Sequence, residues 1–255
     1  MLLAILVIPG MVPDGKGVIF KVTRVTFVNG YRCDKITSVR LPDTVTDLDV
    51  GVFAGASLES IYISKSVKNI EENANTQLKK VPKYEVADDN PYFKSDSNGA
   101  LYSKDGKTLR FVPSSIPLTS GAYTVNPDVE SITKSCFTLI DGLKKITLPP
   151  NLKTISVGYP SIAPIDSLEE FAITGGGNTP FTIKEGVLCK DDVLMFYPRN
   201  KKTENYKVPD GITSLETFSI AFPWHMKKID LNQVTSIAKS SLLSAYKLTE
   251  VTLPK

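Results

Sequence analysis

The amino-acid sequence predicts an α/β repeat fold that is rich in β-structure: a solenoid of short parallel strands with little helix. One apolar pattern recurs at a nearly constant spacing along the chain, as expected for stacked structural repeats. Within each copy the apolar residues alternate and several copies end in proline, which is typical of a short strand that stops sharply. Two copies carry longer segments that match each other and contain hairpin signals.

The repeat is clearest at Leu58-x-x-Ile61-x-Ile63. Further copies of the same pattern begin at Ile36, Leu143, Leu168, Met226 and Leu248. Equivalent positions lie 22 residues apart from Val39 to Ile61 and 25 residues apart from Ile146 to Phe171. Leucine-rich repeats have periods of about 20–29 residues. The spacing therefore predicts a leucine-rich-repeat solenoid over residues 36–255.

The physics of one copy explains why the copies must stack. In a strand, Val39 and Leu41 point to one face and Arg40 to the other. One repeat buries about five apolar side chains, worth about 2 kcal/mol each. Ordering roughly 22 residues costs at least as much, so a repeat is stable only when its neighbours share its core. We therefore expect at least one long parallel sheet along one face.

Two inserts interrupt the repeats and match each other: Gly99–Pro113 and Gly186–Pro198. The first contains Asp105-Gly106 between alternating apolar residues, a hairpin signal. We expect two β-hairpins, at about 88–118 and 178–204, that stand off the edge of the solenoid. Their exposed surfaces, with Tyr102 and Tyr197 nearby, are candidates for binding.

Residues 1–35 are expected to form an N-terminal apolar segment and a capping hairpin. The apolar run Met1–Val12 is too short for a membrane span, which needs about 20 residues. It fits either a signal peptide whose start is trimmed or a strand of the cap. The alternation of Val18, Phe20 and Val22 predicts a hairpin within residues 17–30. At the other end Lys255 follows one strand of a repeat, which leaves both a natural and a truncated C-terminus open.

Segments 36–58 and 206–218 resemble the BspA-like leucine-rich repeats of bacterial surface proteins, and both inserts are typical of that family. The resemblance extends over about 17–255. The family's phenylalanine after the second turn stands at Phe53, Phe137 and Phe218 but is missing near Ala74, and the asparagine of many leucine-rich repeats is found only at Asn151. The resemblance implies a secreted or cell-surface, adhesin-like protein that binds host or neighbouring-cell proteins. We also expect a monomer, and consider a glycan as another partner. An intracellular scaffold for protein–protein interaction is the alternative.

Composition and motifs give no sign of nucleic acid, cofactor or catalysis. The net charge is +3, from 30 Lys+Arg against 27 Asp+Glu spread along the chain, whereas nucleic-acid binding usually needs a clustered basic patch. A membrane-binding polybasic segment is also missing from the sequence. His225, beside Trp224, is the only histidine. Without partners for a triad, it is interpreted as a loop histidine next to an aromatic ring that packs on the solenoid.

The remaining motifs are also assigned to structure. Cys33, Cys136 and Cys189 form no CxxC pair, so we expect small buried or half-buried residues and no metal site. Gly175–Asn178 is expected to be a flexible loop, and Asp88–Asn90 to be turn residues. We therefore expect no catalytic, cofactor-binding or metal-binding residues.

Binding, if it uses the sheet, involves side chains that alternate with the core positions and face outward. This candidate partner-binding face consists of Arg40, Tyr62, Lys145, Thr147, Lys207, Lys228, Asp230 and Thr252. A mixed polar strip of this kind is also ordinary solvated surface. The hairpin inserts are an equal candidate, and the sequence identifies neither the partner nor the face.

Overall fold

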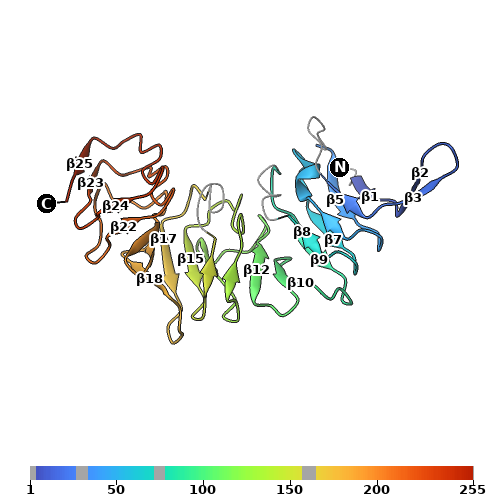
Figure 1. The fold of residues 1–255 in the computed structure, drawn as a ribbon, viewed down its shortest axis with the longest axis horizontal. Coiled ribbons are helices and arrows are strands. Elements are labelled where there is room, and N and C mark those ends of the chain that lie inside the picture. Colours follow the sequence, from blue (N-terminus) through green and yellow to red (C-terminus); the bar gives the residue numbers. More distant parts are fainter. Residues whose placement is uncertain (1–3, 27–33, 72–77, 157–164, 255) are drawn as a thin grey trace. The chain divides into compact units, whose positions relative to one another are not determined.

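The computed structural model describes residues 4–26, 34–71, 78–156 and 165–254. The chain divides into two compact units. Unit 1 comprises Met1–Pro117 and Ile132–Ile140, and unit 2 comprises Leu118–Ser131 and Asp141–Lys255. Each unit is built of short strands stacked as a β-solenoid (Figure 1), and the one helical segment of the described residues is the 3₁₀ turn η1 (Val50–Phe53). This architecture confirms the predicted fold class.

Unit 1 is organised around two parallel sheets. The first, in spatial order, contains β1 (Ala4–Val7), β5 (Ile36–Arg40), β7 (Ser60–Ile63) and β9 (Lys83–Val86). The second contains β4 (Arg24–Val25), β6 (Asp47–Leu48) and β8 (Asn69–Ile70). Val39, Leu41 and Ile61 are buried between them with Leu48. The apolar positions of the repeat therefore form the core that their period predicts.

The N-terminal hairpin lies earlier in the chain than expected. Strands β2 (Met11–Pro13) and β3 (Ile19–Lys21) pair in antiparallel fashion (Figure 1), and every residue in them is exposed. The Asp14 carboxylate accepts hydrogen bonds from the N–H groups of Lys16 and Val18, which fixes the turn between the two strands. Residues 4–7 of the apolar run form β1, which pairs in parallel with β5. Residues 27–33 of the expected hairpin lie outside the described part of the chain.

Both inserts fold as three-stranded antiparallel meanders. In unit 1 the strands are β10 (Phe93–Ser95), β11 (Leu101–Ser103) and β12 (Thr108–Phe111). In unit 2 they are β18 (Phe181–Lys184), β19 (Val187–Lys190) and β20 (Val193–Phe196).

The meanders are part of the core, so the expectation that they stand off the solenoid is wrong. Leu109 and Leu194 are completely buried, and the exposed fractions of Tyr102 and Tyr197 are only 6% and 1%. The cause is the period of two in a strand, which directs alternate apolar side chains of each insert inward. Neither tyrosine can serve as an exposed binding residue.

Unit 2 carries the remaining parallel strands. One sheet contains β13 (Ala122–Thr124), β15 (Lys145–Leu148) and β17 (Glu170–Ile173). Another contains β21 (Asn205–Lys207), β23 (Lys228–Asp230) and β25 (Glu250–Thr252). Strand β20 pairs in parallel with β22 (Ser214–Leu215), and β22 pairs in parallel with β24 (Ser236–Ile237). Strand β16 (Thr154–Ile155) belongs to a different sheet. The short strand β14 (Ser131–Ile132) falls at the division between the units: Ser131 belongs to unit 2 and Ile132 to unit 1.

The expected long parallel sheet is divided into shorter ones of four, three and three strands. The breaks follow β9 and β17, where the chain enters an antiparallel meander. The inserts thus interrupt the parallel ladder instead of leaving it continuous.

Candidate functional site

In unit 1, Arg40 and Tyr62 of the candidate face lie opposite each other on β5 and β7. The guanidinium carbon of Arg40 is 4.0 Å from the centroid of the Tyr62 ring, a cation–π contact. Arg40 is exposed and Tyr62 is half-buried. The two side chains stabilise each other on the outer face of the sheet.

In unit 2, the other members of the face lie on two separate sheets. Lys145 and Thr147 are on β15. On the second sheet Lys207 lies opposite Asp230, which in turn lies opposite Thr252, and Lys228 precedes Asp230 on β23. All of these side chains are exposed or half-buried.

The lysines of this face are already engaged by neighbouring carboxylates. Lys145 Nζ is 2.7 Å from Glu170 Oε1, and Lys228 Nζ is 2.5 Å from Glu250 Oε2. Each pair joins adjacent strands in register. Exposed pairs of this kind contribute about 0–1 kcal/mol, so they remain available for exchange with a partner's charges.

Unit 2 also contains an open groove of about 430 Å³. Its walls come from three successive repeats and a following loop: Thr119, Ser120, Ala122, Lys144, Lys145, Glu169, Glu170, Lys201 and Lys202. We call this the lysine–glutamate groove. Lys144 is exposed, and its ammonium group has no hydrogen-bond or ion-pair partner within the described ranges. The groove presents four ammonium groups beside two carboxylates, which suits a partner that carries both signs of charge.

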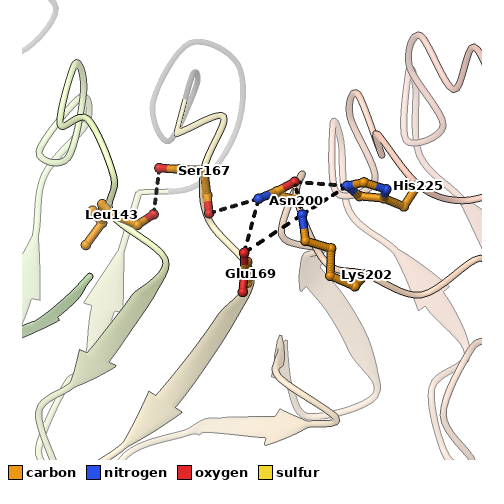
Figure 2. A network of polar contacts seen from close by, with 6 residues as sticks. All are labelled: Leu143, Ser167, Glu169, Asn200, Lys202 and His225. Atoms are coloured by element: carbon orange, nitrogen blue, oxygen red, sulfur yellow. Dashed lines mark hydrogen bonds and ion pairs between the residues drawn. The ribbon is translucent and has the colours of Figure 1, made fainter. Parts of the chain in front are cut away.

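Beside this groove, a polar network centres on Asn200 (Figure 2). Its Oδ1 accepts a hydrogen bond from Lys202 Nζ at 2.8 Å and lies 3.0 Å from His225 Nε2. Its Nδ2 donates to Glu169 Oε1 at 3.3 Å. Ser167 Oγ extends the chain of contacts by donating to the carbonyl oxygen of Leu143 at 2.9 Å. Figure 2 shows these side chains converging from loops that precede the strands.

The surroundings of His225 shift its pKa. Partial burial and the nearby Lys202 and Lys247 ammonium groups lower the pKa of His225 below its usual value. Glu204 and Glu169 oppose this effect. The structure thus places His225 in a polar network, where sequence reasoning saw only a packed loop histidine.

The other sequence motifs take structural roles. Cys136 and Cys189 are buried, and Cys33 lies outside the described residues. Burial raises the pKa of the Cys189 thiol to about 11. Asn90 is a buried turn residue. The described ranges contain no cluster of three acidic, histidine or cysteine side chains arranged for a metal ion. They also include no helix with the length and apolar character needed to cross a bilayer.

Sequence reasoning missed Lys144, Glu169, Lys201 and Lys202. A signal was present in the charged doublets Lys144-Lys145, Glu169-Glu170 and Lys201-Lys202. Two of these doublets stand at the start of successive strands, so the repeat spacing brings opposite charges side by side.

Stacked strands of this kind, with an open charged groove, define a repeat solenoid, a class of protein that typically serves as a non-catalytic interaction scaffold. The family model described as "BspA type Leucine rich repeat region (6 copies)" matches residues 22–97, 118–174 and 195–255. The chain therefore belongs to the BspA-type leucine-rich repeat family. A comparison with curated proteins finds no match.

Solved structures share the fold at low sequence identity. A leucine-rich repeat protein from Eubacterium ventriosum matches with a TM-score of 0.53 and 15% identity, over 87% of this chain and 59% of that one. A leucine rich cell surface protein from Faecalibacterium prausnitzii matches with a TM-score of 0.50 and 16% identity, over 98% and 69%. The pneumococcal vaccine antigen PcpA matches with a TM-score of 0.53 and 16% identity, over 99% and 78%. The chain thus spans only 59% of the length of the first of these proteins.

Proposed function

We propose that the chain is a non-catalytic protein-binding module, secreted or displayed on a bacterial cell surface, that recognises a host or neighbouring-cell protein through the lysine–glutamate groove of unit 2. The observation that carries this proposal is the groove itself, about 430 Å³ of open space lined by four lysines and two glutamates. Complementary charges across an interface steer association and select the partner.

Two further observations support this function. Leucine-rich repeats typically bind proteins, and the six repeat copies place the chain in such a family. One structural neighbour is described as a cell surface protein and another as a vaccine antigen. The candidate face on the strands adjoins the groove through Lys145, which belongs to both. Binding would then extend from the groove onto Thr147 and its neighbours.

A charge-reversal experiment tests the groove. Immobilised full-length chain is incubated with extracellular-matrix proteins and, separately, with lysate of the source cell. We expect a matrix or surface protein to be captured, and Lys144→Glu to lower its affinity at least tenfold, about 1.4 kcal/mol. Lys239→Glu is the matched control, because Lys239 is an exposed lysine of unit 2 outside the groove.

Two results would count against the proposal. Equal capture by wild type and Lys144→Glu would remove the groove from the binding surface. Capture of a cytoplasmic protein only, with no peptides released when intact cells are shaved with protease, would favour the intracellular scaffold instead.

A further inference from the structure

Three aromatic rings gather on neighbouring repeats of unit 2, at Phe222, Trp224 and Tyr246. The ring centroids of Phe222 and Trp224 are 6.2 Å apart, and those of Phe222 and Tyr246 are 6.5 Å apart. Tyr246 is 77% exposed, and the other two are half-buried. Soluble proteins rarely leave large aromatic side chains clustered at the surface without a use.

The Phe222 ring of this cluster packs against a buried arginine. Arg199, itself 5% exposed, places its guanidinium carbon 4.5 Å from the centroid of the Phe222 ring. Its Nη1 is 2.8 Å from Asp166 Oδ1. The backbone N–H of Trp224 donates to the carbonyl oxygen of Arg199 at 2.9 Å, which joins the two segments. The Phe222 ring is therefore ordered before a ligand binds, which lowers the entropy cost of binding to it.

Hydrogen-bonding groups come from the same chain segments as the rings. Asn200 directly follows Arg199, and His225 directly follows Trp224. Both belong to the polar network of Figure 2, which contains donors and acceptors. The charged groups acting on His225 are two lysines and two glutamates, so they favour neither a polyanion nor a polycation.

We propose that the aromatic cluster Phe222, Trp224 and Tyr246, with Asn200 and His225 beside it, binds a neutral carbohydrate. A pyranose ring offers an apolar C–H face to aromatic rings, and each of its hydroxyl groups both donates and accepts hydrogen bonds. An apolar protein side chain would cover the rings but strip water from the neighbouring polar groups without replacing its hydrogen bonds, which is costly. This ligand goes beyond the protein partner proposed for the groove and uses separate aromatic residues.

The test is binding of the full-length chain to an array of neutral oligosaccharides derived from cellulose, chitin, xylan, mannan and starch. We expect at least one to be retained and to shift the fluorescence of Trp224, the only tryptophan of the chain. Tyr246→Ala should lower that affinity at least tenfold, because it removes the most exposed ring of the cluster. Because Tyr246 is 77% exposed, its replacement should leave the fold intact, which circular dichroism checks.

Two control variants test whether carbohydrate binding depends on the aromatic cluster itself. Tyr92→Ala removes a tyrosine of unit 1 that is 48% exposed and should leave binding unchanged. Lys144→Glu should also leave it unchanged, which separates this site from the groove. Retention of no neutral oligosaccharide, or equal retention by wild type and Tyr246→Ala, would overturn the proposal. Loss of a captured protein in Tyr246→Ala without any glycan binding would instead identify a protein-docking patch.

Discussion

Replacing Asn90 by alanine should lower the free energy of unfolding of unit 1 by about 4 kcal/mol. The Asn90 side chain is completely buried. Its Nδ2 donates to the carbonyl oxygens of Ser64 at 2.8 Å and Val67 at 3.0 Å. Its Oδ1 accepts from the N–H groups of Tyr92 and Phe93, each at 2.8 Å. At about 1 kcal/mol for each bond, losing all four lowers the equilibrium constant for folding roughly a thousandfold.

Guanidinium unfolding followed by circular dichroism measures the change in the free energy of unfolding. Hydrogen exchange of the Phe93 amide gives a local measure within unit 1. Asn98→Ala is the matched control, since Asn98 is exposed, and it should stay within about 0.5 kcal/mol of wild type. A loss of less than about 1 kcal/mol for Asn90→Ala would refute the reasoning, because the four backbone groups would then have found other partners.

Three further outcomes follow from buried or partly buried groups. The Tyr206 hydroxyl is buried beside Tyr197, ring to ring at 4.8 Å, and has no hydrogen-bond partner in the described part of the chain. Tyr206→Phe should therefore raise the free energy of unfolding by about 1 kcal/mol in a urea titration, and a decrease would contradict this. Because burial raises the pKa of Cys189 to about 11, peptide mass spectrometry should find it unlabelled by iodoacetamide at pH 8 until the protein unfolds. His225, the only histidine, should have a pKa below 6.5 in an NMR titration. Because the unfolded chain then binds the proton more tightly than the folded chain, the free energy of unfolding should fall as the pH drops through that range. A titration midpoint at or above 6.5 would contradict the argument.

The repeat fold could be predicted because the apolar residues that form the core recur at the period of the repeat. Val39 and Ile61 are 22 residues apart and lie opposite each other on adjacent strands. The same alternation continues through the inserts, where Leu101 and Leu109 are buried. Sequence reasoning gave weight to the turn at Asp105 and too little to these leucines, and so placed the meander outside the core.

The candidate site was only partly predictable. The outward direction of Lys145 follows from strand alternation, but its ion pair with Glu170 depends on the register between two strands. The contact of Asn200 with His225 joins residues 25 apart, which is one repeat. Comparing polar residues one repeat apart would have suggested it. The groove volume depends on how loops pack around it, and no sequence pattern contains that information.

Photo-crosslinking from the groove on intact source cells tests the central claim most directly. Lys144 is replaced by p-benzoylphenylalanine, with the same replacement at Lys239 as the control, and adducts are identified by mass spectrometry after illumination. Our account predicts that the Lys144 position forms a covalent adduct with a host or neighbouring-cell protein and that the Lys239 position does not. Equal adducts from both positions, or adducts with cytoplasmic proteins alone, would contradict a surface-displayed binding module that works through this groove.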